Sequence, residues 1–344
     1  MEGEPLGGFA MTMLTRRQTL EAFGAVAVAT VAPSSTAALS SEANQSVVYW
    51  TPELSKDAFL RMYHLINKEI SGKVALKLHT GEPNGPNILP REWVKALQAE
   101  IPNSNIVECN VLYKSPRQTT AGHRKVIEQN GWTFCPVDIM DEEGDVALPV
   151  KDGLHLKEFH VGKHLLNYDS MVVLTHFKGH GMGGFGGSLK NISIGCGSAA
   201  HGKVELHNVQ PDGSWPGKAP FMERMADGGK AILDHFGKKI VFINVLRNMS
   251  IDCDCAGVQA STPTLPDLGI MASTDLLAID QACVDLIYSL PDFMKRTMVK
   301  RIESREALRQ LSAMRELKMG NPNYKIVRVL DIKPGQRPLE DDIA

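Results

Sequence analysis

The densest group of potentially reactive side chains lies near the middle of this 344-residue chain. Residues 175–191 contain His176, Lys178 and His180 near the start and Lys190 near the end. An imidazole exchanges protons near neutral pH and binds metals, and a lysine amine binds anions. We therefore predict a site of acid–base or metal chemistry in this segment.

Between these side chains the segment holds six glycines within nine residues. Glycines at this density lower local stability unless the backbone must take a positive φ or approach another group closely, and their N–H groups can hold an anion. The pattern is neither a Walker A sequence nor a dinucleotide fingerprint. Two interpretations stay open. One is a cofactor-binding or anion-binding loop formed by Gly183, Gly184, Gly186 and Gly187, and the other is a long flexible loop.

Further metal-binding residue types follow this loop. Cys196, His201 and His207 are candidate ligands by their chemistry. In Asp252-Cys253-Asp254-Cys255 the Cys-x-Cys spacing places two thiols close enough to share a metal or to form a disulfide. As a metal site it needs partners such as Cys196 or a histidine. A strained redox-active disulfide and a structural role are the alternatives.

Two upstream loops carry polar side chains directly after expected strands. His79 ends a strand at 73–79, and Tyr113 to Arg117, followed by His123, come after a strand at 105–112. The carboxyl ends of parallel strands share one edge of a sheet, so these side chains should meet His176 there. Such a rim of His, Lys and Arg favours a small anionic substrate.

Strands that alternate with helices must position these loops, which predicts the α/β class with parallel βαβ units. We expect two mixed or parallel-sheet α/β lobes, residues 45–165 and 166–344, with the glycine-rich loop at the site. The boundary lies in the region 165–240, where the alternation breaks. Residues 141–161 have short alternating segments and predict a small antiparallel excursion. The expected elements are strands at 47–50, 73–79, 105–112, 170–175, 239–245 and 268–272, and helices at 57–70, 91–99, 119–130, 227–236, 274–290 and within 293–314.

The N-terminal residues 1–40 have the organisation of a twin-arginine signal peptide. Arg16 and Arg17 precede an apolar run at 23–32, and small residues follow Pro33. The run is too short to be a membrane span. We therefore expect the twin-arginine export machinery as a partner and a periplasmic or extracellular location. This route often carries proteins that already hold a cofactor.

Composition narrows the possible partners further. The formal net charge is −2, and no basic stripe interleaved with aromatic residues is visible, so nucleic acid is not expected as a ligand. The six cysteines are too scattered for a disulfide framework.

Several motifs in this order resemble the domain of unknown function 362 family. They include 77–82, 113–117, 176–196, 253–255, 267–269 and 278–280. The resemblance covers about Val47 to Leu290, and members are often described as uncharacterised iron–sulfur-centre proteins. This chain has no Cys-x2-Cys-x2-Cys repeat, so a ferredoxin-type cluster is not carried over.

The order His180, glycine loop, Lys190 is also distantly similar to the nickel-pincer lactate racemase family. That similarity implies that His180 is an acid/base residue, that Lys190 holds a pincer-type nucleotide covalently, and that His123 is the opposing acid/base. It implies His201 or His207 as a metal ligand. His79 joins the loop glycines and Lys190 as a cofactor-binding candidate.

Three functions follow from these observations. The first is an enzyme, isomerase-like or an oxidoreductase, with a metal or organometallic cofactor (nickel, iron or zinc) and a small anionic substrate. The second is a non-catalytic metal- or iron–sulfur-binding redox protein that uses Cys253 and Cys255. The third is a solute-binding protein whose glycine-rich loop holds an anion.

Overall fold

The computed structural model describes residues 45–329, and the signal peptide expected at 1–40 lies outside them. An eight-stranded sheet forms the centre of this part of the chain, and most neighbouring strands are parallel. Only β11 runs antiparallel to its two neighbours in the sheet. The strand order is β12 (Tyr324–Arg328), β1 (Ser46–Thr51), β11 (Gly269–Ser273), β10 (Ile240–Leu246), β7 (Ser170–His176), β2 (Val74–Lys77), β3 (Ser104–Glu108) and β4 (Val137–Ile139). The predicted α/β class is confirmed.

The division into two lobes at residues 165/166 does not appear in this sheet. Strand β1 of the expected first lobe lies between β12 and β11 of the expected second lobe, and β2 pairs with β7. All described residues fall in one compact unit that begins at Gln45. A central strand of a sheet covered on both faces needs a neighbour on each side, and here these neighbours come from distant parts of the chain. The break in strand–helix alternation after residue 165 is therefore an insertion into one sheet and not a boundary between two sheets.

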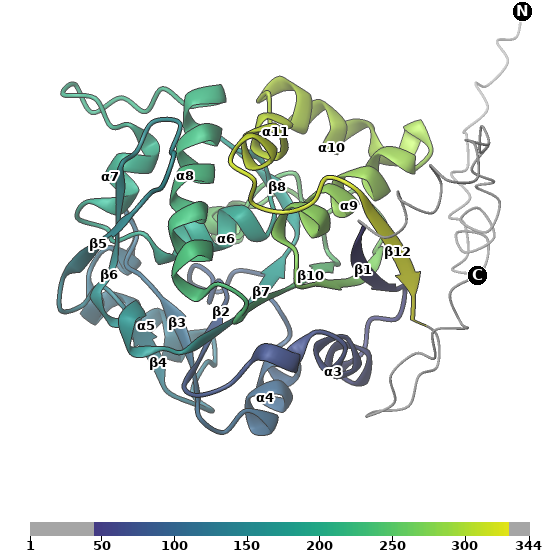
Figure 1. Cartoon of the computed structure of the whole chain (residues 1–344), viewed down its shortest axis with the longest axis horizontal. Coiled ribbons are helices and arrows are strands. Elements are labelled where there is room, and N and C mark those ends of the chain that lie inside the picture. The colour runs from purple at the N-terminus through teal and green to yellow at the C-terminus, as the bar shows by residue number, and fades with distance from the viewer. Residues whose placement is uncertain (1–44, 330–344) are drawn as a thin grey trace, which may run out of the picture. The chain divides into compact units, whose positions relative to one another are not determined.

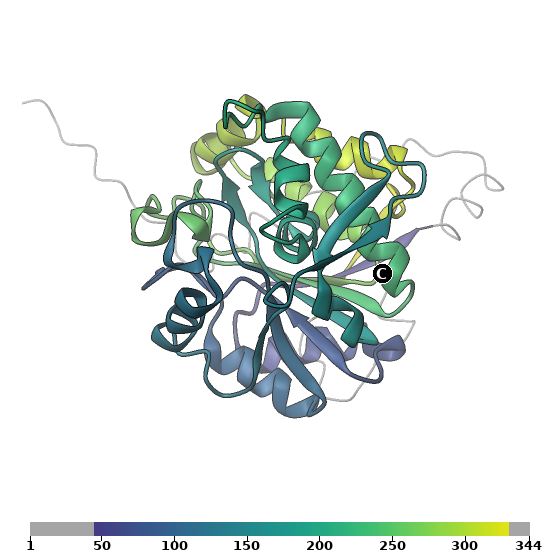
Figure 2. The same ribbon diagram turned by 90° about the vertical axis from the view of Figure 1, so that its left-hand side faces the viewer.

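Helices cover both faces of the sheet (Figures 1 and 2). One face packs against α3 (Lys56–His64), α4 (Arg91–Glu100) and α5 (Thr120–Gln129). The other packs against α6 (Ser188–Cys196) and α9 (Leu276–Ser289), with α8 (Lys218–Phe236) and α11 (Arg309–Glu316) outside them. The remaining helices are α7 (Gly202–His207), α10 (Asp292–Ser304) and the 3-10 turns Asn67–Glu69, Pro116–Gln118, Lys163–Asn167 and Asp254–Gln259.

Alternation along β2 separates the core from the chemistry. Val74 and Leu76 belong to the hydrophobic core under α3 and α4. The side chain of Lys77, the residue after Leu76, turns to the opposite face and reaches α6, where its amine donates to Asn191. Because side chains alternate between the two faces of a strand, the charged Lys77 lies on the α6 side of the sheet although the strand is fully buried.

The glycine-rich segment is an ordered hairpin, so the flexible-loop interpretation is wrong. Strands β8 (Lys178–His180) and β9 (Gly184–Gly186) pair antiparallel and lead directly into α6. Gly184 has φ 74°, and a Cβ there would lie 2.3 Å from Cβ of Ala307. Only glycine suits this position.

The expected antiparallel excursion is also present. It consists of β5 (Asp145–Pro149) paired with β6 (Glu158–Gly162). Among the described residues, no helix is long and apolar enough to cross a bilayer.

Candidate functional site

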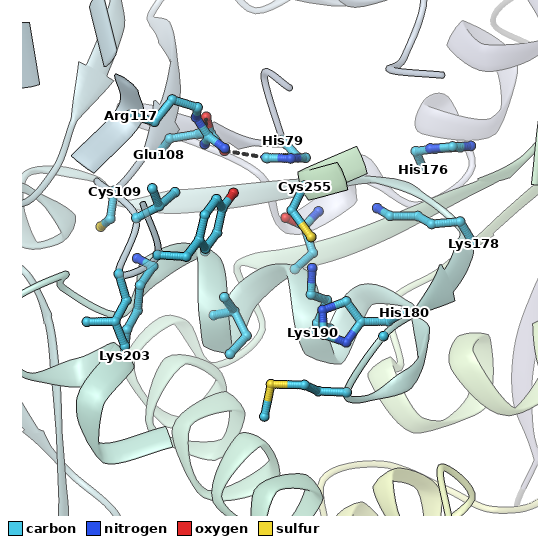
Figure 3. Close-up of a pocket in the computed structure, with 18 of the residues that line it drawn as sticks. His79, Glu108, Cys109, Arg117, His176, Lys178, His180, Lys190, Lys203 and Cys255 are labelled. Atoms are coloured by element: carbon cyan, nitrogen blue, oxygen red, sulfur yellow. Dashed lines mark hydrogen bonds and ion pairs between the residues drawn. The ribbon is translucent and has the colours of Figure 1, made fainter. Parts of the chain in front are cut away.

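A cavity of about 330 Å³ opens at the carboxyl ends of β2, β3 and β7 (Figure 3). It confirms that the polar loops after separate strands meet at one edge of the sheet. The polar side chains in its lining are Lys77, His79, Glu108, Tyr113, Arg117, His176, Lys178, His180, Lys190, Asn191, Lys203, His207 and Cys255. Leu89, Val111, Leu174, Ile194 and Trp215 supply apolar wall.

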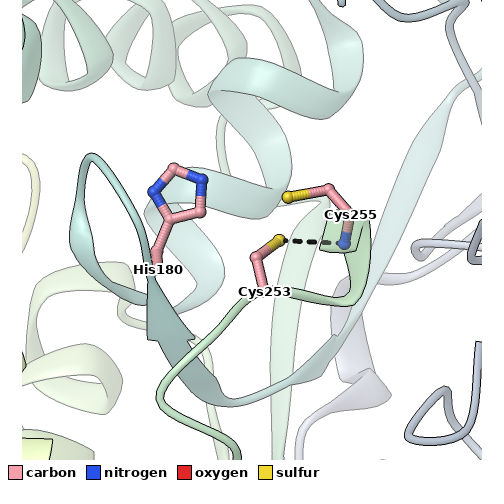
Figure 4. Close-up of side chains that lie close together, drawn as sticks. All are labelled: His180, Cys253 and Cys255. Atoms are coloured by element: carbon pink, nitrogen blue, oxygen red, sulfur yellow. Dashed lines mark hydrogen bonds between the residues drawn. The ribbon is translucent and has the colours of Figure 1, made fainter. Parts of the chain in front are cut away.

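The Cys-x-Cys pair lies beside the glycine-rich hairpin (Figure 4), and Cys255 of the pair lines the cavity. One ligand atom each from His180, Cys253 and Cys255 lie within 4.8 Å of one another. The amine of Lys190 donates to Sγ of Cys253 over 3.1 Å. The prediction that these segments converge on one pocket is therefore met by the geometry.

Electrostatics favour a thiolate at Cys253. A hydrogen bond from the Cys255 side chain lowers the pKa of Cys253 well below its usual value, and the Lys190 charge adds to this effect against the opposing effect of burial. Burial lowers the pKa of Lys190, but the two thiol groups outweigh it and raise the pKa overall. Lys190 and Cys253 each favour the charged form of the other, so electrostatics favour an ammonium–thiolate contact.

The position of the proton on His180 follows from its backbone contact. Nδ1 of His180 accepts a hydrogen bond from the N–H of Gly183 at 2.7 Å. In the neutral ring the proton must then be on Nε2. Burial, with a further contribution from Lys190, lowers the pKa of His180 to about 3. The ring is thus a neutral N–H donor at the cavity.

His207 has the opposite arrangement. Its Nδ1 donates to the carbonyl oxygen of Lys203 at 2.6 Å, so the lone pair is on Nε2. The ring packs against Trp215, with ring centroids 4.4 Å apart. Burial lowers the pKa of His207 to about 4. A histidine whose other nitrogen donates to a backbone carbonyl has the usual arrangement of a metal ligand.

His176, predicted as a metal ligand, has both ring nitrogens engaged. Nδ1 lies 2.9 Å from a carboxylate oxygen of Asp254, and Nε2 lies 2.7 Å from the carbonyl oxygen of Arg247. The amine of Lys178 lies 3.2 Å from the same carboxylate. His176 therefore has no nitrogen left for a metal, and its role is to hold the Cys253–Cys255 turn through Asp254.

His123, predicted as the opposing acid/base, is fully buried and outside the cavity lining. Its Nε2 accepts from Nε of Arg117 at 3.1 Å. Arg117 also donates to Glu108 at 2.8 Å, and Glu108 lies 3.1 Å from Nδ1 of His79. Of the two upstream histidines, His79 is the one that lines the cavity, and its Nε2 is buried without a partner. A helix position inside α5 explains why His123 turns inward.

Cys196 and His201 do not join the Cys-x-Cys pair. Cys196 is fully buried and outside the cavity lining, and burial raises the pKa of its thiol to about 11. The His201 side chain is 62% exposed and pairs with Asp145 at 2.8 Å. Of the two histidines proposed as alternative ligands, His207 is the one at the cavity.

The glycine loop does not offer its α6 end as an anion cradle. The N–H groups of Ser188 and Leu189 donate to the two carboxylate oxygens of Asp280 at 2.8 and 2.9 Å. A Cβ on Gly187 would lie 2.5 Å from that carboxylate. The lack of a side chain at Gly187 therefore leaves room for the Asp280 carboxylate and not for an external anion. Of the four loop glycines named as cofactor-binding, only Gly187 lines the cavity.

Sequence reasoning missed two buried lysines in the cavity wall. Lys77 donates to the carbonyl oxygen of Leu78 at 2.8 Å and to Asn191 at 3.0 Å. Lys203 donates to the carbonyl oxygen of Gly197. The sequence indicates Lys77 as unusual, because it is a lysine within the otherwise apolar run 74–78.

Two solved structures show a distant likeness. The lactate racemase apoprotein from Thermoanaerobacterium thermosaccharolyticum aligns at 12% identity over 71% of this chain and 57% of its own, with a TM-score of 0.39. A crystal structure of a Thermotoga maritima protein aligns at 15% identity over 57% of this chain and 51% of its own, with a TM-score of 0.35. The chain thus matches little more than half the length of either neighbour.

A comparison with curated proteins gives no match. The family comparison, in contrast, covers more than half of the chain and takes in β2, the glycine-rich hairpin, the Cys-x-Cys turn and α9. Residues 74–285 match the model described as domain of unknown function (DUF362). The chain therefore belongs to the DUF362 family.

Proposed function

We propose that this protein is a metal-dependent enzyme that acts on a small organic anion in the cavity. The observation that carries the proposal is the set of soft donors at the cavity wall. The sulfur atoms of Cys253 and Cys255 and a ring nitrogen of His180 lie within 4.8 Å of one another, and Cys255 and His180 line the cavity. Protein sites that catalyse reactions at a metal keep such an incomplete set of donors and leave a position for substrate.

The donor chemistry restricts the metal. Thiolates with imidazole nitrogen select zinc, iron or nickel over magnesium and calcium. The electrostatic preference for a thiolate at Cys253 supports ligation, because thiolates and not thiols bind metals. A metal bound here would polarise a substrate oxygen or stabilise charge that develops on the substrate.

The two cavity histidines suit different tasks. His207 presents a lone pair on Nε2, which fits a ligand to a metal or cofactor. His180 presents N–H at Nε2 as long as Gly183 donates to its Nδ1, which fits a neutral hydrogen-bond donor to a substrate oxygen. Ligation by His180 would require loss of the Gly183 hydrogen bond. We therefore assign Cys253 and Cys255 to the metal and His180 to a hydrogen bond with the substrate. His207 is a further candidate ligand from the cavity wall, outside the group of three residues whose ligand atoms lie within 4.8 Å of one another.

Lys190 is the proposed anchor of the cofactor. Its amine reaches the donor set through Cys253, and covalent attachment of a pincer-type nucleotide at this amine is the most specific form of the proposal. We also propose that residues 1–40 direct export by the twin-arginine route, which agrees with a cofactor acquired before export.

The second candidate is a non-catalytic redox or metal-binding protein that uses only Cys253 and Cys255. The coupled thiol pair favours it, since a low-pKa thiol beside a second thiol is typical of redox dithiols.

Paired variants separate the two candidates. The full chain, purified from its native host, is analysed for metal content and intact mass as wild type, as Cys253→Ser/Cys255→Ser and as Lys190→Ala. The enzyme proposal expects metal in the wild type and loss of any covalent adduct and most metal in Lys190→Ala. If Lys190→Ala keeps its full metal content while the double variant loses it, the redox candidate is favoured. Metal-free wild-type protein contradicts the enzyme proposal and leaves the second candidate only as a dithiol redox protein.

A further inference from the structure

The cavity has two ends with different electrostatic character (Figure 3). At one end the Lys190 amine donates to the sulfur of Cys253 over 3.1 Å, and the Lys178 amine lies 3.2 Å from the carboxylate of Asp254. At the other end Lys203 lies near Cys109 (Figure 3). Lys77, at the end of β2, interacts electrostatically with both Cys109 and Lys203 and therefore belongs to the same end.

Lys77 and Lys203 differ from the other cavity cations in their partners. Their residues are 1% and 4% exposed, and both line the cavity. The hydrogen bonds that hold their amines go to the neutral oxygens of Leu78, Asn191 and Gly197. Within residues 45–329 neither amine makes an ion pair. The nearby carboxylate of Glu108 is already held by Arg117 and by Thr80.

Two buried ammonium groups without a counter-ion are costly to maintain. The chain nevertheless makes room for one of them. A Cβ on Gly195 would lie 2.3 Å from Cε and 2.4 Å from Nζ of Lys77, so the glycine on α6 leaves the space that the amine occupies. Neutral oxygens fix the direction of each amine without cancelling its charge, which leaves the charge available to a ligand in the cavity.

We propose that Lys77 and Lys203 form a carboxylate-binding subsite. It receives the anionic group of the substrate at the end of the cavity away from the Cys253–Cys255 pair. The apolar wall formed by Val111, Leu174 and Ile194 would contact the carbon atoms next to the carboxylate. The inference rests on the proposed function for the identity of the ligand as substrate, but the binding of an anion does not depend on a metal.

The test uses propionate as the probe and propionamide as its neutral isostere. Binding is measured by calorimetry on the full chain and on the Cys253→Ser/Cys255→Ser variant, which carries no thiol donor set. We expect propionate to bind both proteins and propionamide to bind neither. Lys77→Met and Lys203→Met should each weaken propionate binding by about tenfold or more, since each removes a buried charge contact.

Lys178→Met is the matched control, because its amine lies in the same cavity but is neutralised by Asp254. Its affinity for propionate should stay within about twofold of the wild type, as expected for a charge that is already paired. Gly195→Ala keeps both lysines and adds a Cβ at the position of the Lys77 amine, so it should weaken binding as Lys77→Met does. Thermal unfolding midpoints establish that each variant is folded.

Three results would overturn the subsite. They are a wild type that does not bind propionate, equal losses in Lys178→Met and Lys77→Met, and unchanged binding in both Lys77→Met and Lys203→Met. A wild-type protein that holds no metal when purified from its native host, but that still binds propionate, would refute the proposed function and leave the subsite in place.

Discussion

The amine of Lys190 lies 3.1 Å from the sulfur of Cys253, although 63 residues separate them in the chain. Helix α6 carries the lysine, and the turn after β10 carries the cysteine. The contact joins the glycine-rich segment to the Cys-x-Cys motif, which the sequence presents as two separate constellations. Each group favours the charged form of the other, so the contact favours at Cys253 the thiolate form that the proposed metal site requires.

Lys190→Met should raise the pKa of the Cys253 thiol and slow its alkylation. Removal of the positive charge leaves burial to oppose ionisation, and each unit by which the pKa rises costs about tenfold in thiolate fraction at pH values below the pKa. The measurement is the rate of iodoacetamide modification of metal-free Cys255→Ser protein at neutral pH, with and without the lysine substitution. An unchanged rate would show that the amine does not stabilise the thiolate.

His207 should make the metal-free protein less stable in acid. Its pKa is about 4 in the fold and about 6.5 in the unfolded chain, so between these values the unfolded chain binds more protons and stability falls as pH falls. The loss by pH 4 is about 3 kcal/mol at most. His207→Gln should flatten the dependence of unfolding free energy on pH in this window.

His201→Gln is the control for that experiment. The hydrogen bond to Asp145 raises the pKa of the exposed His201, so its contribution to stability has the opposite sign: present at low pH and lost as pH rises. The substitution should not flatten the acid slope. Equal slopes for wild type and His207→Gln would contradict the assignment of a neutral buried ring.

Asp280→Ala should destabilise the fold by about 2–4 kcal/mol, because it leaves two buried N–H groups at the start of α6 without partners. Asp280 also accepts from Asn244 at 2.9 Å. Asp285→Ala on the same helix removes only exposed hydrogen bonds and should cost less than about 1 kcal/mol. Chemical denaturation of both variants makes the comparison, and equal losses would contradict the role of Asp280.

Cys196→Ser should retain any metal that the wild type holds. The Cys196 thiol is buried and does not line the cavity. The hydrogen bond from Cys109 goes to the backbone carbonyl oxygen of Cys196 and not to its thiol. The measurement is the metal content of Cys196→Ser compared with that of Cys253→Ser, which should lose the metal. Loss of metal in both variants would bring Cys196 back as a ligand.

The sequence predicted the class of the fold because its strands and helices have clear periods. The helix expected at 57–70 ends at His64, where a 3-10 turn follows, and the helix expected from residue 227 begins at Lys218. Strand β12 was missed because its short run of residues includes Lys325 and Arg328 at an exposed sheet edge. The pairing of β1 with β11 and β12 depends on contacts between the two ends of the chain, which periodicity does not report.

The site was predictable to the extent that strand ends reveal it. His180, Lys190, His79 and Cys255 follow strands or the glycine-rich turn, and they meet. Which histidines point inward was not predictable. His123 lies on a helix face turned to the protein interior, and the charge of Arg117 that it contacts comes from another element.

The local environment of a metal in protein from the native host tests the central claim most directly. X-ray absorption spectroscopy at the metal edge should show about two sulfur neighbours at about 2.3 Å, with nitrogen or oxygen completing the shell, and Cys253→Ser/Cys255→Ser should lose the sulfur neighbours. A protein without metal, or a metal surrounded only by nitrogen and oxygen in the wild type, would contradict the account.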